Sequence, residues 1–153
     1  MLFEISLWIL KKIVKTYPII SKNINSEDNF YISMNLSLNE IRDENFVNSA
    51  IEILSNSNIG PHKICLEIVE NVKIDKLDIL NTSIKKLKDA GFKIAIDDFG
   101  IEYSNLDILK KLDFDIVKLD KYFVDDLSSC EIKQEVIKFM SKITTITNKS
   151  LII

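Results

Sequence analysis

The chain has 153 residues, of which 46% are hydrophobic and 28% are charged, and its formal net charge is −3. This composition is typical of one globular domain and excludes a disordered chain. The negative charge argues against general electrostatic binding of a nucleic-acid polymer. The apolar N-terminal stretch is too short to span a bilayer and would contact a membrane only as an interfacial helix. Because Cys65 and Cys130 do not make a disulfide framework, we expect a cytoplasmic protein without a membrane span.

The first third of the chain carries clear signals for where helices begin and end. Apolar residues at helical spacing predict a helix over residues 2–17, and Pro18 is expected to end it. Ser37 and Glu40 form a capping-box pattern, which predicts a second helix that continues through Leu54.

Strands and helices alternate along the whole chain. Strands are predicted at 30–36, 63–69, 92–96 and 114–119, further helices at 75–90, 104–111 and 131–147, and the start of a fifth strand at 151–153. Gly91 is the expected C-cap of the helix that precedes it. This alternation predicts an α/β fold in which the strands pair in parallel through right-handed crossovers, with residues 1–153 forming one domain.

The most informative local feature is the pair of acids that follows the third predicted strand. Asp97 and Asp98 come directly after the apolar run 92–96, and Gly100 then allows the backbone to turn. Adjacent like charges at a strand end repel each other unless a cation compensates them. A pair of divalent metal ions is a common solution at sites of phosphate chemistry.

Polar residues also mark the ends of the neighbouring strands. Asn35, Glu67, Asp97 and Lys118 each lie within or at the end of a successive apolar strand, and a (β/α) barrel brings such positions to one rim. Carboxylate and amide oxygens suit Mg²⁺ or Mn²⁺, and a lysine beside them could orient water or neutralise charge in a transition state. The alternative is a set of buried salt bridges in which Lys118 pairs with Glu67 or Asp97.

The residues at these strand ends form motifs that resemble those of a known family. The motifs, in chain order, are MNLS at 34–37, LEIVE at 66–70, IAIDDFG at 94–100, YSNL at 103–106 and DIVKLD at 115–120. Their order and spacing are similar to those of the EAL domain, a cyclic di-GMP phosphodiesterase with a TIM-barrel-like fold. The resemblance covers almost the whole chain.

The resemblance to the EAL domain implies a function and a set of site residues. The implied reaction is metal-dependent hydrolysis of cyclic di-GMP to linear pGpG, with two Mg²⁺ or Mn²⁺ ions in the complete site. Asn35, Glu67, Asp97 and Asp98 would be metal ligands and Lys118 a catalytic residue. Asp120 would lie near the site and contribute to substrate binding.

The sequence also departs from the family pattern. It contains no Glu-Ala-Leu motif, and it ends where a later strand with a Glu-Gly-Val-Glu glutamate is expected. A complete barrel needs eight strands and about 250 residues, so we expect a partial arc that lacks the first and last strands.

Three expectations follow from these departures. The chain alone should be weak or inactive, and its unpaired strand edges favour a homo-oligomer. Ile101 and Glu102 replace a threonine and a glycine of the usual family loop, which puts metal coordination in question. The alternative function is therefore a degenerate EAL domain that binds cyclic di-GMP or a protein partner without cleaving it.

Overall fold

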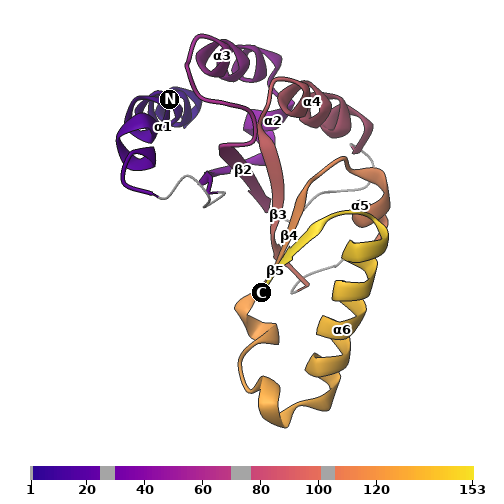
Figure 1. The fold of residues 1–153 in the computed structure, drawn as a ribbon. Helices are drawn as coiled ribbons and strands as arrows, with labels where there is room; N and C mark the ends of the chain where they lie inside the picture. The colour runs from indigo at the N-terminus through magenta and orange to yellow at the C-terminus, as the bar shows by residue number, and fades with distance from the viewer. Residues whose placement is uncertain (1, 25–29, 70–76, 101–105) are drawn as a thin grey trace.

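The computed structural model describes residues 2–24, 30–69, 77–100 and 106–153, and the fold is a curved parallel sheet with helices along its outer side (Figure 1). The sheet has five strands in the order β1-β2-β3-β4-β5, so that every strand pairs with its neighbour in sequence. The strands are β1 Ile32–Leu36, β2 Ile64–Val69, β3 Lys93–Phe99, β4 Ile116–Leu119 and β5 Ser150–Ile152. The predicted α/β class, the parallel pairing and the open arc are confirmed.

The helices bury the apolar face of this sheet. They are α1 Leu2–Ser21, α2 Leu38–Arg42, α3 Glu44–Ser55, α4 Leu77–Asp89, α5 Leu106–Lys111 and α6 Glu131–Ile146, with short 3-10 helices at Lys121–Phe123 and Leu127–Ser129. Because side chains alternate along a strand, Leu66 and Ile68 of β2 enter the main core together with Ile94 of β3. The opposite face carries Glu67, Asp97 and Lys118 beside a small apolar cluster around Cys65. No described helix covers this face (Figure 1).

The first helix is longer than predicted. Pro18 lies inside α1, which continues to Ser21, so the expectation that Pro18 ends the helix is wrong. Proline removes one backbone hydrogen bond, and here only the final turn follows it. That turn keeps side-chain bonds of its own, since the Ser21 hydroxyl donates to the Pro18 carbonyl at 3.1 Å. No helix in the described part of the chain is long and apolar enough to cross a bilayer.

The region after β1 contains two helices where the sequence predicts one. The Ser37–Glu40 capping box is present and starts α2, as expected. Asp43 then has an extended backbone, ends α2 and accepts a hydrogen bond from the Phe46 amide at 2.8 Å as the N-cap of α3. An aspartate that caps a new helix competes with continuing the old one, which explains the break.

The connection from α4 to β3 confirms the predicted glycine cap. Gly91 has a φ of +106°, its amide donates to the Lys88 carbonyl at 2.8 Å, and the Phe92 amide donates to Leu87 at 3.1 Å. This pair of bonds is the Schellman arrangement that satisfies the last carbonyls of a helix.

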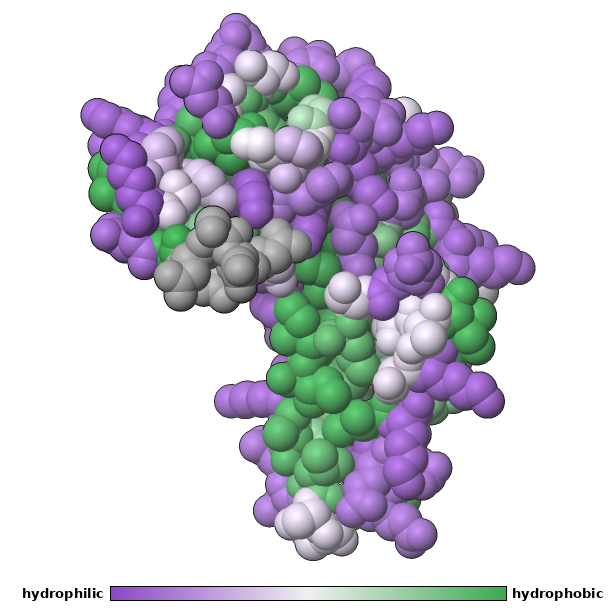
Figure 2. Space-filling model, in the orientation of Figure 1, coloured by the Kyte–Doolittle hydropathy of each residue, from purple (hydrophilic) through white to green (hydrophobic). Residues whose placement is uncertain are grey.

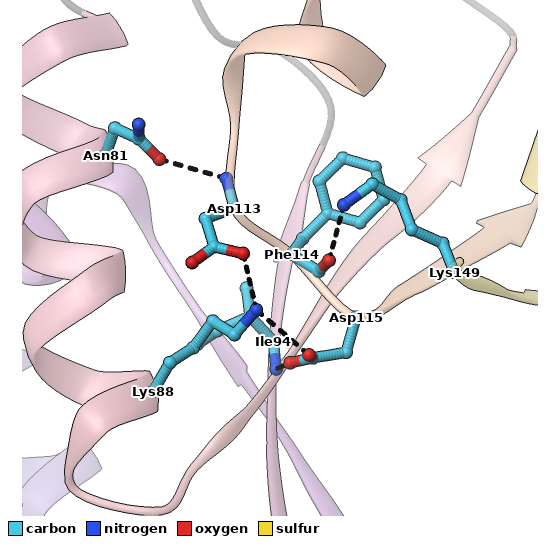
Figure 3. A network of polar contacts seen from close by, with 7 residues as sticks. All are labelled: Asn81, Lys88, Ile94, Asp113, Phe114, Asp115 and Lys149. Atoms are coloured by element: carbon cyan, nitrogen blue, oxygen red, sulfur yellow. Dashed lines mark hydrogen bonds and ion pairs between the residues drawn. The ribbon is translucent and has the colours of Figure 1, made fainter. Parts of the chain in front are cut away.

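A polar network holds the start of β4 against α4 and β3 (Figure 3). The Lys88 Nζ lies 2.6 Å from the Asp113 carboxylate and 3.0 Å from that of Asp115. Asp115 also accepts a hydrogen bond from the Ile94 amide at 2.9 Å, and Asn81 accepts one from the Asp113 amide at 2.9 Å. The network fixes the end of the sheet that lies opposite the polar strand ends.

Candidate functional site

The sheet face that carries Asn35, Glu67, Asp97 and Lys118, called here the open face, brings the predicted site residues together. Asn35 is paired in register with Glu67, and Glu67 is paired with Ala95. Asp97 lies two residues beyond Ala95, so the period of two puts its side chain on the same face. All of these residues lie at the carboxyl ends of parallel strands, where (β/α) barrels hold their active sites.

Lys118 connects two of the predicted metal ligands. Its Nζ lies 2.9 Å from Oε2 of Glu67 and 2.9 Å from Oδ1 of Asp97. The three side chains are 26%, 12% and 19% exposed, respectively, so these ion pairs are largely shielded from water. Burial lowers the pKa of Lys118, but hydrogen bonds to Asp97 and Glu67 outweigh this and leave it above its ordinary value. Lys118 is therefore held as an ammonium ion.

Asp98 occupies a backbone conformation that the sequence does not reveal. The register between β3 and β4 shifts between Ile96 and Phe99, and Asp98 has a φ of +55°. A bulge of this kind redirects a side chain at the end of a strand. Partial burial of the carboxyl group, followed by the charges of Asp97 and Asp120, raises the pKa of Asp98. The charges of Asp97 and Asp120 therefore both act on the Asp98 carboxyl group at the end of β3.

Asp120 has a structural contact at the edge of this cluster. Its side chain accepts a hydrogen bond from the Tyr122 amide at 2.6 Å and caps the 3-10 helix Lys121–Phe123. Its charge also contributes to the raised pKa of Asp98. The predicted substrate contact of Asp120 stays a prediction.

The glycine after the acids is required by its surroundings. Gly100 has a φ of +111°, and a Cβ at this position would overlap the ring of Phe123. The turn predicted from Asp97-Asp98-Phe99-Gly100 is confirmed. Ile101 and Glu102, which follow it, lie outside the described residues, so their predicted effect on the site stays untested.

Below the polar cluster, the open face has a small core of its own, and the apolar neighbours of Cys65 in its strand predict that Cys65 is buried. Cys65, Ala95 and Ile116 are 0%, 1% and 3% exposed, and Tyr31 packs against them. Burial, followed by the charge of Glu67, raises the pKa of the Cys65 thiol to about 12. The alternation of Cys65 with Glu67 in the sequence is the signal that places both on one face.

The donor set fits a hard divalent cation in its chemistry. Glu67, Asp97 and Asp98 supply carboxylates and Asn35 an amide oxygen, the ligand types that Mg²⁺ and Mn²⁺ prefer. One lysine faces three carboxylates, so negative charge remains in excess. However, within residues 2–24, 30–69, 77–100 and 106–153 no three acidic, cysteine or histidine side chains are grouped closely enough to hold a metal. Lys118 lies between Glu67 and Asp97 instead, the pairing of the salt-bridge alternative.

A comparison of the sequence with models of known protein families decides which family this chain belongs to. The model of the EAL domain family matches residues 1–153. The chain belongs to the EAL domain family. The motifs at its strand ends and the curved parallel sheet agree with this membership.

Individual relatives agree with the assignment as an EAL domain. The chain is 32% identical over 150 residues to the cyclic di-GMP phosphodiesterase PdeA of Borreliella burgdorferi. The aligned residues make up 97% of this chain and 22% of PdeA. It matches the EAL domain of Mycobacterium smegmatis DcpA with a TM-score of 0.83 and 26% identity, over 94% of this chain and 64% of that one. The chain therefore spans about a fifth of the length of PdeA.

A more distant structure supports the fold alone. The FimX EAL domain from Pseudomonas aeruginosa, whose structure was solved with bound c-di-GMP, aligns with a TM-score of 0.77 and 20% identity. The alignment covers 95% of this chain and 57% of that one. At this identity the likeness establishes the shared arrangement of strands and helices.

Proposed function

We propose that this EAL domain acts in metal-dependent hydrolysis of cyclic di-GMP to linear pGpG. The observation that carries the proposal is the placement of Asn35, Glu67, Asp97 and Lys118 on one face, at the carboxyl ends of four adjacent parallel strands. The 32% identity to a cyclic di-GMP phosphodiesterase supports the choice of substrate.

Each residue of the open face has a distinct function in this proposal. Asn35, Glu67, Asp97 and Asp98 would hold Mg²⁺ or Mn²⁺, two ions in the complete family site, and Asp120 would contribute to the binding of the dinucleotide. The bound ions would polarise the phosphodiester and make a bound water more acidic. Lys118, a fixed ammonium ion between two acids, stabilises negative charge that develops on the phosphate or orients the attacking water. The absence of the Glu-Ala-Leu glutamate from the sequence leads us to expect weak or no turnover by these 153 residues.

The test separates binding from hydrolysis. Cyclic di-GMP is incubated with the chain and Mn²⁺ or Mg²⁺, the linear product is followed by chromatography, and binding is measured by calorimetry. Asp97→Asn should abolish metal-dependent binding, and Lys118→Met should lower any turnover by about 10²-fold or more. Asp113→Asn is the matched control because Asp113 lies at the opposite end of the sheet, in the network of Figure 3.

The second candidate is a domain that binds cyclic di-GMP without cleaving it. It is favoured by the position of Lys118, whose ion pairs occupy the facing oxygens of Glu67 and Asp97. Binding that needs no divalent ion, together with no product at any metal concentration, would support this candidate. Failure of the chain to bind the dinucleotide with or without metal would contradict both.

We also infer a homo-oligomer in the cytoplasm. Ile132, Phe139 and Ile146 on α6 are 77%, 48% and 73% exposed, and Figure 2 shows apolar surface over the half of the molecule that contains α6. Exposed apolar surface of this kind is typical of an interface. Cys65 and Cys130 are both free, as a reducing compartment requires.

A further inference from the structure

The outward face of α1 combines apolar and basic side chains. Ile5, Trp8, Ile9, Ile19 and Ile20 are 49%, 58%, 37%, 64% and 37% exposed, respectively, so a large apolar surface of α1 faces outward. The inward side of the same helix is already used, since Leu10 and Tyr17 are 1% and 8% exposed. The exposed residues lie outside the core formed by the described residues.

Lysines lie beside and within this apolar surface. Lys11, Lys12 and Lys15, and Lys22 just beyond the helix, are all exposed, whereas Glu4 is the only acid of α1. The chain as a whole has a net charge of −3, so positive charge is concentrated here against the overall sign.

Helical geometry arranges these residues in neighbouring rows. With about 100° of rotation per residue, Lys11 and Lys15 fall on one edge of the exposed arc and Ile5 and Ile9 on the other. Trp8 lies between the two rows, and the Lys12 Nζ is 5.2 Å from the centre of its ring. One helix thus presents Lys11 and Lys15, with Glu4 between them, on one side of the indole ring, and Lys12 among the isoleucines on the other side.

We propose that α1 docks this domain onto the surface of an anionic lipid bilayer. Isoleucine side chains would enter the boundary between headgroups and acyl chains, and tryptophan favours this interfacial depth. Lysines beside them would contact lipid phosphates, with their aliphatic stems along the apolar layer. The helix lies in the plane of the membrane and does not cross it. This function is independent of the chemistry of the open face.

Charge decides between a bilayer and a second copy of the chain. Two α1 helices packed face to face would bury Lys12 against a second helix that itself carries three lysines and one glutamate, which is unfavourable. An anionic lipid surface neutralises the same lysines, and each lysine near it raises the partition coefficient about fivefold. The combination of basic and apolar residues therefore favours lipid.

Trp8 provides a direct measurement because it is the only tryptophan of the chain. The 153-residue chain is titrated with vesicles of phosphatidylcholine alone and of phosphatidylcholine with phosphatidylglycerol, and tryptophan emission and co-sedimentation are recorded. We expect a blue shift and sedimentation only with the anionic vesicles, and release by high salt. Equal binding to neutral vesicles, or no shift with either, would overturn the proposal. So would a blue shift that follows protein concentration without vesicles, because it would indicate a protein partner.

Double variants test which side chains of α1 contact the lipid surface. Lys11→Glu with Lys15→Glu should weaken vesicle binding by at least about 25-fold, since two cations are removed. Ile5→Gln with Ile9→Gln should abolish the blue shift and leave the fold unchanged by circular dichroism, because both side chains are exposed. Lys138→Glu with Lys142→Glu makes the same charge change on α6, where both lysines are exposed. If this control weakened binding equally, the contact would not be specific to α1.

Discussion

Lys118 compensates two carboxylates that would otherwise repel each other at the ends of β2 and β3. Its Nζ is 2.9 Å from both Glu67 and Asp97, and all three side chains are largely shielded from water. The contact is compatible with a structural salt bridge and with a site that exchanges one cation for another. The two interpretations differ in what happens when the lysine is removed and a divalent ion is added.

Replacing Lys118 by methionine should separate these interpretations. Lys118→Met leaves Glu67 and Asp97 without a cation, so the free energy of unfolding in urea should fall by about 2 kcal/mol. If the acids form a metal site, Mn²⁺ should stabilise the variant more than the wild type, because the ion enters without displacing an ammonium group. Lys86→Met is the control, since the Lys86–Glu44 pair is 45% and 73% exposed and should contribute little. Equal responses to Mn²⁺ would favour the purely structural role.

Gly100 should tolerate no side chain. Gly100→Ala should cost roughly 2–4 kcal/mol, because the φ of +111° disfavours a side chain and the new Cβ would overlap Phe123. Gly60→Ala should be neutral or stabilising by about 0.5 kcal/mol, since nothing lies within 4 Å of the Cβ position. Urea unfolding of both variants measures the contrast, and similar midpoints would contradict the strain at Gly100.

At the scale of elements, α4 positions the strands that carry the site. The last turn of α4 supplies Lys88, which contacts Asp113 and Asp115 just before β4, and Asp115 in turn binds the Ile94 amide of β3 (Figure 3). This network ties the start of β4 to β3 from the end opposite the acids. Lys118 lies three residues beyond Asp115, so the network also fixes where Lys118 enters the open face.

The Lys88 network should stabilise the fold in a pH-dependent way. Burial lowers the pKa of Lys88, but hydrogen bonds to Asp113 and Asp115 outweigh it and leave the pKa raised above 10.5. A raised folded-state pKa contributes stability below the unfolded-state value, and this is lost as pH rises through the folded-state value. Lys88→Met should therefore cost about 1 kcal/mol at pH 7, and the difference from wild type should shrink above pH 10.5. A cost that does not change with pH would contradict the ion pair as its source.

The sequence predicted which helices and strands form more accurately than it predicted the residues at which they begin and end. Capping residues with an unambiguous local pattern, Ser37 and Gly91, were placed correctly, because each satisfies backbone groups at one helix end. Pro18 was misjudged because a proline near the end of a helix removes only one bond. The left-handed backbone of Asp98 depends on the register between β3 and β4, which no local pattern records.

At the scale of the whole molecule, the predicted convergence of Asn35, Glu67, Asp97 and Lys118 followed from topology alone. Parallel strands in sequential order must bring their carboxyl ends to one edge. What topology leaves open is which cation the acids hold, because that depends on side-chain contacts. Two apolar surfaces also face outward on this arc, one on α1 and one on α6, and we assign a different partner to each.

The exposed residues of α6 should mediate self-association. Ile132, Phe139 and Ile146 recur every seven residues, with Val136 and Ile143 between them, which is the spacing of a seam between helices. Replacing the three exposed residues by glutamine should reduce the mass measured by sedimentation to that of a monomer, since it removes their apolar contact. Ile5→Gln with Ile9→Gln on α1 should leave the mass unchanged and abolish only vesicle binding. If the α1 variants also changed the mass, the two surfaces would form one interface, and the assignment of α1 to lipid would be wrong.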